Sequence, residues 1–227
     1  MTYEFDFSVL LPYWSLFLEG AWLTLKLSAV ATVLGCIAGT LLAIGRADGS
    51  RWLKFVIGTY VEVIRNTPLL VQVFLVYFGL ASVGVKVTAN GAAVAALVVN
   101  VAAYTCEIVR AGLESIHKSQ IEAADCLGLN RRQIYWHVIV RPAIERVYPA
   151  LTSQYVLLML ASSITSQISA EELTAVANRI QSETFRSFET YIVTGVIYIL
   201  LSFLVRGAFV AAGQLLFPRR RKLGTAI

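Results

Sequence analysis

The sequence predicts an all-helical membrane protein with five membrane-spanning helices. Of the 227 residues, 57% are hydrophobic and the mean hydropathy is +0.69, which is more apolar than a water-soluble core requires. Runs of about 20 mostly apolar residues can cross a ~30 Å hydrocarbon layer as helices. Such runs cover residues 20–44, 55–80, 91–109, 147–165 and 191–217. They lack the strict alternation of barrel strands, and lipid cannot satisfy exposed backbone groups, so helices are favoured.

The positions of lysine and arginine predict the orientation. Thirteen of these cations follow the first span, lie between the third and fourth spans, or follow the fifth, whereas the opposite segments hold only Lys86, Arg179 and Arg186. By the positive-inside rule the N-terminus is outside and the C-terminus cytoplasmic. We therefore expect an outer interfacial segment (1–19), a transmembrane domain (20–217) and a basic cytoplasmic tail (218–227). A charge of +5 distributed in this way indicates a membrane protein and not a nucleic-acid-binding one.

The first span carries small residues at helical spacing. Gly35 and Gly39, with Ser28 and Thr32 nearby, would let another helix approach closely. The neighbour is either another helix of this chain or a second subunit.

The second span contains an unusual polar segment. Its members are Glu62, Arg65, Asn66, Thr67, Pro68 and Gln72. Pro68 lacks a backbone N–H and crowds the preceding turn, so we expect a kink there. Glu62 and Arg65 are spaced i,i+3 and close enough to form an intramembrane ion pair. The pair either fixes the helix register or belongs to a polar path.

The third span carries Asn100, Tyr104, Glu107 and Arg110. Spacings of four, three and three residues place them near one helical face. Glu107 and Arg110 form a second expected ion pair. Because lipid exposure of such a face would cost several kcal/mol, it points to the bundle interior or a wet cavity. It serves either as interhelical hydrogen bonding or as the lining of a passage.

Two further polar segments follow. Ser163 and Gln167, after the fourth span, either line a passage or bond to their own helix. The loop 116–142 reads as two short helices joined by a turn at Gly128, because glycine commonly ends a helix. A polar, basic loop of this kind in an otherwise apolar chain is suited to docking.

Three stretches together resemble the permeases of bacterial ABC importers. The loop matches their EAA pattern at Glu122, Ala123, Ala124, Gly128 and Pro142. The segments VEVIRNTPLLVQ and NVAAYTCEIVRAGL resemble the second and third spans of the polar amino-acid branch. The resemblance covers about residues 20–201. The family's Lys-Asp-Thr-Ser-Leu stretch is absent after span four, where Ser162, Ser163 and Ile164 stand, so no particular amino acid carries over.

The resemblance implies a type I ABC importer permease in the bacterial inner membrane, with a multi-pass fold. Its partners would be two ATPase subunits, a second permease chain, identical or homologous, and a periplasmic amino-acid-binding protein. The chain itself would hold no cofactor, because the ATPase partner would bind ATP and magnesium. Coupling to the ATPase would use Glu122, Ala123, Ala124, Leu127 and Gly128. The substrate path would use Asn66, Thr67, Gln72, Asn100, Tyr104, Glu107, Ser163 and Gln167.

Other classes of protein remain as alternatives: a non-transporting membrane scaffold or assembly subunit, or a secondary amino-acid transporter. The sequence has no detectable inverted repeat, and this counts against a secondary transporter. The sequence has no phosphate-binding loop, no HExxH and no GxSxG elbow, so we expect a transport subunit and not an enzyme. His117 and His137 have no second ligand at metal spacing, and no metal site is expected.

Overall fold

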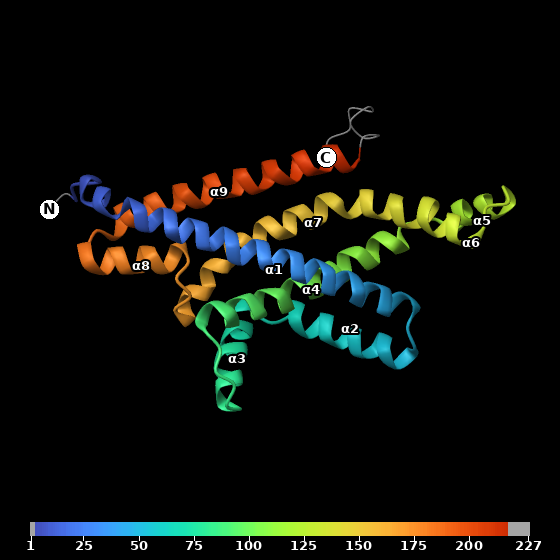
Figure 1. Ribbon diagram of the computed structural model, residues 1–227, viewed down its shortest axis with the longest axis horizontal. Helices are drawn as coiled ribbons and strands as arrows, with labels where there is room; N and C mark the ends of the chain where they lie inside the picture. Colours follow the sequence, from blue (N-terminus) through green and yellow to red (C-terminus); the bar gives the residue numbers. More distant parts are fainter. Residues whose placement is uncertain (1–2, 218–227) are drawn as a thin grey trace.

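The computed structural model describes residues 3–217, and regular secondary structure in that range is helical throughout (Figure 1). The longer helices are α1 (Trp14–Asp48), α2 (Arg51–Arg65), α3 (Leu69–Ser82), α4 (Ala89–Glu114), α7 (Arg141–Ala161), α8 (Leu173–Thr184) and α9 (Ser187–Leu216). Shorter elements are η1 (Ser8–Tyr13), α5 (Lys118–Cys126), α6 (Arg131–Gln133), η2 (Ile134–Val140) and η3 (Ser162–Ile168). The predicted basic tail, 218–227, lies outside the described residues.

Four helical segments in the described part are long and apolar enough to cross a membrane. They are Ser8–Asp48, Ala89–Glu114, Arg131–Ile168 and Ser187–Leu216. Helices α2 and α3 are bent by 109° relative to each other, and a fifth span results if they count as one broken crossing. The prediction of an all-helical chain is thus confirmed, the five predicted spans correspond to four or five candidate membrane helices, and the expected kink at Pro68 is a sharp break.

The small residues of α1 serve packing within this chain. A methyl group on Gly39 would come within 2.6 Å of the Ala102 carbonyl oxygen, and one on Gly35 within 2.6 Å of Val101. Only glycine therefore permits α1 to lie this close to α4, along the crossing visible in Figure 1. Of the two alternatives for these residues, the intrachain neighbour is the one observed.

The start of α1 and the presence of α8 differ from the prediction. Helix α1 begins at Trp14, not Gly20, because Phe17 is fully buried against Met159 and Leu173 and so extends the packed helix beyond the apolar run. Helix α8 was not predicted, since it is a short amphipathic helix with a weak apolar signal. It lies beside α1 and α9 at the N-terminal end of the molecule (Figure 1).

The N-terminal segment is held against the start of α9. The backbone N–H of Asp6 donates to Glu189 at 3.0 Å, and the Tyr3 hydroxyl also donates to this buried carboxylate. Arg186 donates to the Glu4 carbonyl at 3.0 Å. These contacts fix the segment at the end of the bundle that the cation distribution predicts to be outside.

Candidate translocation and coupling sites

The break between α2 and α3 frees backbone carbonyls that lipid cannot satisfy. Side chains next to the break donate hydrogen bonds to these carbonyls. The Asn66 amide donates to the Glu62 carbonyl at 2.8 Å, and the Thr67 hydroxyl donates to the Val63 carbonyl at 2.9 Å. Pro68, in extended conformation, precedes the first residue of α3 and prevents the ladder from continuing. The end of α2 is therefore capped by polar side chains instead of water.

A second layer of contacts comes from α3 and α4. The Gln72 amide nitrogen lies 2.7 Å from the Ile64 carbonyl and 3.0 Å from the Thr67 carbonyl. The Asn100 amide donates to the Gln72 oxygen at 2.9 Å, and both side chains are buried. Asn100 thus orients Gln72, which closes the helix end. These two predicted path residues are engaged in holding the break.

The charged residues of α2 have partners other than each other. Within residues 3–217 no ion pair joins Glu62 to Arg65; instead Glu62 accepts from the Asn66 amide at 3.1 Å. The Arg65 guanidinium lies over the Tyr104 ring, 5.5 Å from its centroid, as in a cation–π contact. Glu62, Arg65, Asn66 and Thr67 are all exposed on the single chain. They form a polar rim around the break.

The C-terminal part of the α4 polar face forms a cluster of ion pairs. Glu107 pairs with Arg110, as the spacing predicts, and also with Arg46 of α1 at 2.8 Å. Arg110 also forms an ion pair with Glu114, at 2.5 Å. Sequence reasoning missed Arg46, since it lies 61 positions from Glu107 and only the α1–α4 crossing brings them together. Glu107 is therefore compensated by two cations.

In the polar run after α7, part of the hydrogen bonding stays within the helix itself. The Ser163 hydroxyl donates to the Leu160 carbonyl at 2.8 Å, which is the second of the two alternatives for this residue. Gln167 is exposed on η3. The structure does not join either residue to the break by a hydrogen bond, whereas it gathers Asn66, Thr67, Gln72 and Asn100 there.

The loop 116–142 reverses direction at Gly128. The φ angle of Gly128 is +75°, a left-handed conformation that glycine adopts without steric cost, and the Leu129 N–H bonds to the Ala124 carbonyl at 3.2 Å. Ala124 is buried, while Glu122 and Ala123 are exposed and Leu127 is 80% exposed. The predicted glycine turn between two helical stretches is confirmed.

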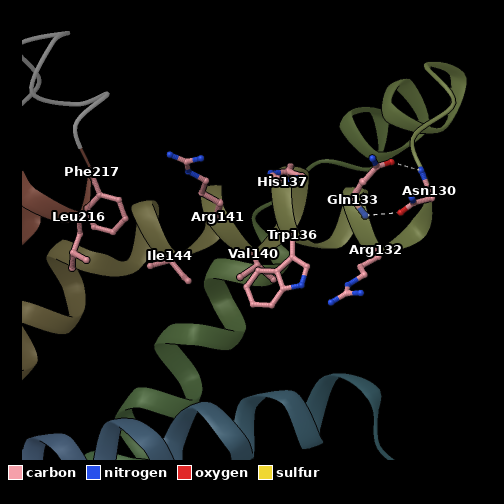
Figure 2. Close-up of a pocket in the computed structure, with 10 residues that line it drawn as sticks. All are labelled: Asn130, Arg132, Gln133, Trp136, His137, Val140, Arg141, Ile144, Leu216 and Phe217. Atoms are coloured by element: carbon pink, nitrogen blue, oxygen red, sulfur yellow. Dashed lines mark hydrogen bonds between the residues drawn. The ribbon is translucent and has the colours of Figure 1, made fainter.

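The second half of this loop starts with a capping box. The Asn130 side chain accepts from the Gln133 N–H and the Gln133 side chain from the Asn130 N–H, both at 2.9 Å (Figure 2). The next residues, Ile134–Val140, form a π-helix that continues into α7. Such segments are rare and often occur at functional sites.

A buried carboxylate joins α1, α8 and α9 at the end of the molecule away from the loop 116–142. Glu172 caps α8 by accepting from the Ala175 N–H at 3.0 Å, and the Tyr198 hydroxyl donates to it at 2.6 Å. Thr24 of α1 accepts from the Leu173 N–H at 3.1 Å. Burial raises the pKa of Glu172. An acid directly before an apolar run is a capping signal that could have revealed α8.

The folded chain combines a carbonyl-capped break between two apolar helices with a helical loop at one end of the molecule. The family model described as binding-protein-dependent transport system inner membrane component matches residues 31–218. The chain belongs to this family. Membership decides among the three functional classes in favour of the ABC permease.

Relatives make the assignment more specific. The chain is 34% identical over 213 residues to the octopine transport system permease protein OccM of Rhizobium radiobacter, covering 90% of this chain and 87% of that protein. It is 34% identical over 197 residues to the arginine transport system permease protein ArtQ of Bacillus subtilis, covering 86% and 90%. The protein is an amino-acid ABC transporter permease subunit.

Solved structures agree with the fold. The permease aligns with a chain from a crystal structure of an amino acid ABC transporter with histidines at a TM-score of 0.86 and 36% identity, covering 93% of this chain and 99% of that one. A MetNI methionine ABC transporter chain aligns at 0.72 with 20% identity, covering 91% and 98%, which shows the shared fold alone. The expected type I importer permease fold is confirmed.

Proposed function

We propose that this permease forms the passage for a polar amino acid across the bacterial inner membrane, and that the α2–α3 break lines that passage. The observation that carries the proposal is the exposed polar rim around the break. Charged and amide side chains at membrane depth must face water or protein, because lipid exposure costs several kcal/mol. The rim is exposed on the single chain, so a second permease chain opposite it would enclose a wet path.

The rim has the charges that an amino acid requires. Glu62 supplies an acceptor for an α-ammonium group, and Arg65 supplies donors for an α-carboxylate. The Tyr104 ring lies beneath the Arg65 guanidinium. Asn66 and Thr67 are next to Arg65 in the chain. In this proposal Asn100 and Gln72 act indirectly, by holding the break open in a fixed shape. Glu107, Ser163 and Gln167 have less support, because Glu107 is already paired and the Ser163 hydroxyl bonds to its own helix.

Energy enters through the loop at the other end. We propose that α5 and the Gly128 turn dock on one of two ATPase subunits, which bind ATP and magnesium, and that a periplasmic binding protein delivers the substrate. The exposed Glu122, Ala123 and Leu127 support this assignment, since Leu127 is an apolar side chain without cover in the chain. The second permease chain is identical or homologous.

Substrate-stimulated ATPase activity of the reconstituted complex, measured with a panel of amino acids, tests the function. We expect Arg65→Gln and Glu62→Gln to lower stimulation or change the preferred amino acid while the complex still assembles. Thr59→Val is the control, because Thr59 is exposed on the same helix and bonds only to its own Phe55 carbonyl. Unchanged stimulation and selectivity in both rim variants would move the path elsewhere.

The proposed orientation has a separate test. In a variant with Cys36, Cys106 and Cys126 replaced by serine, new cysteines at Thr88 and Glu171 should react with an impermeant thiol reagent in intact cells. One at Asn130 should react only after permeabilisation. All three positions are exposed in the structure, so accessibility depends on the side of the membrane. Labelling of position 130 from outside would invert the topology.

A further inference from the structure

A groove of about 620 Å³ lies between η2, the start of α7 and the end of α9 (Figure 2). Two neighbouring stripes at four-residue spacing line it, one through Arg132 and Trp136 and the other through His137 and Arg141. At its α9 end the lining is apolar, with Ile144 and Phe217. No residue of the proposed path belongs to this lining, and from the turn it includes only the capping-box residues Asn130 and Gln133.

The lining is positively charged and unpaired. Arg132 and Arg141 supply the charge, His137 lies in the same lining, and no acidic side chain belongs to it. In the described part of the chain, none of these three side chains takes part in a hydrogen bond or an ion pair. Figure 2 shows Arg132 and Arg141 pointing to different sides of the helix, so each guanidinium offers its own free donors. Either one suits a phosphate group, because arginine can bind phosphate with two parallel hydrogen bonds.

Polarity changes along the groove. Figure 2 shows Arg132 at the loop end, Trp136 and His137 next, then Arg141, and finally Ile144 and Phe217 beside the end of α9. The ligand that fits this order has an anionic head and an apolar remainder. Trp136 is 56% exposed, and tryptophan favours the depth of lipid headgroups at membrane surfaces.

We propose that this groove binds the phosphate headgroup of an anionic phospholipid from the cytoplasmic leaflet, with Arg141 as the phosphate contact and Arg132 as a second cation that attracts the anionic headgroup from the loop end. The proposal rests on the orientation given under Proposed function. The sequence continues after Phe217 with Arg219, Arg220, Arg221 and Lys222. A basic cluster directly after a membrane span is a known attraction for anionic lipid, worth about 1 kcal/mol for each cation. A lipid bound here would join the docking loop to the last span.

A lipid accounts for both ends of the groove. Free phosphate or a nucleotide would use the arginines but leave the exposed apolar side chains of Ile144 and Leu216 uncovered. The ATPase partner is the alternative occupant of a surface at this end of the molecule, and the experiment is arranged to detect it.

The test uses the full-length chain in neutral detergent, with Trp14, Trp22 and Trp52 changed to phenylalanine so that only Trp136 emits. All three are exposed, so the changes leave packing intact. Phosphatidylglycerol with brominated acyl chains should quench Trp136 at a several-fold lower mole fraction than brominated phosphatidylcholine. Arg132→Gln and Arg141→Gln should each weaken this preference roughly five-fold. High salt should also weaken it.

Arg51→Gln is the matched control, because Arg51 is an exposed arginine on the same predicted side and lies outside the groove. Equal quenching by the two lipids, or an equal loss in the control, would overturn the proposal. Displacement of the lipid by inorganic phosphate at equal concentration would make the groove a free-phosphate site and also overturn it. So would loss of lipid quenching on assembly with the ATPase, if Arg132→Gln then prevented that assembly.

The readout does not depend on transport. A chain that binds phosphatidylglycerol through these arginines but shows no amino-acid stimulation would contradict the proposed function alone. A transporter with normal uptake but no headgroup preference would contradict only the lipid site.

Discussion

The α2–α3 break and the turn between α5 and α6 are two helix interruptions in this permease that are built differently. At the break, Asn66, Thr67 and Gln72 supply donors to freed carbonyls, and Asn100 of another helix holds Gln72. At the turn, Gly128 and a local capping box suffice. The difference follows from burial, because Gln72 and Asn100 are buried and need partners within the chain, whereas the exposed turn can also bond to water.

The largest effect should come from the turn. Gly128→Leu places a side chain in a left-handed conformation at φ +75°, which costs about 1–2 kcal/mol and favours another loop path. We expect uptake to fall at least about ten-fold, the change that 1.4 kcal/mol produces, while membrane insertion stays normal. Radiolabelled amino-acid uptake with quantification of membrane-inserted protein measures both. Gly207→Leu is the control, since that glycine has open space and an ordinary helical backbone. Normal uptake in Gly128→Leu would remove the turn from coupling.

The next effect concerns the break. Gln72→Leu removes the donor at 2.7 Å from the partly buried Ile64 carbonyl, which keeps only the Thr67 hydroxyl at 3.3 Å, at a cost of about 1–3 kcal/mol. We expect a lower thermal midpoint of the detergent-solubilised complex and faster aggregation. Gln214→Leu is the matched control, because Gln214 is exposed on α9. If both variants are equally stable, water and not Gln72 caps the break.

Asn100→Leu should cost less, about 1–2 kcal/mol, because Gln72 keeps its own contacts with α2. In a double-mutant cycle, Asn100→Leu should add little to Gln72→Leu, since the two side chains act through one hydrogen bond. Thermal unfolding of the four proteins measures the coupling. Strict additivity would mean that Asn100 acts on something other than Gln72, such as the substrate.

The smallest effect should come from the cap at the turn. Asn130→Ala removes the side chain that accepts from Gln133, and such a loss typically costs about 1 kcal/mol. We expect faster proteolysis of the loop with no change in the global thermal midpoint. Asn130→Asp retains an acceptor and should behave like the parent. A global loss of stability would mean that the turn, like the break, is part of the core.

Much of this arrangement was accessible from local patterns. The Pro68 break, the Gly128 turn and the Glu107–Arg110 pair depend on residues close in sequence, whose geometry is fixed by backbone rules. Partners far apart in the chain were not accessible. Arg46 beside Glu107, and Gln72 bound to Asn100, arise only when α1 and α3 pack on α4. The expected Glu62–Arg65 contact did not form because Asn66 and Tyr104 offer these charges other partners.

By itself the sequence determined that the chain crosses a membrane several times as helices, where the second crossing breaks and where the loop turns. Long apolar runs, one proline and one glycine act through the bilayer thickness and the backbone, so they need no tertiary partner. Tertiary structure alone decided which polar groups are already satisfied. Asn100 and Gln72 look like path residues in the sequence, yet packing turns them to a helix end and leaves Glu62 and Arg65 on the open rim. Hydrogen bonds between helices depend on how those helices cross, and a linear pattern does not contain the crossing.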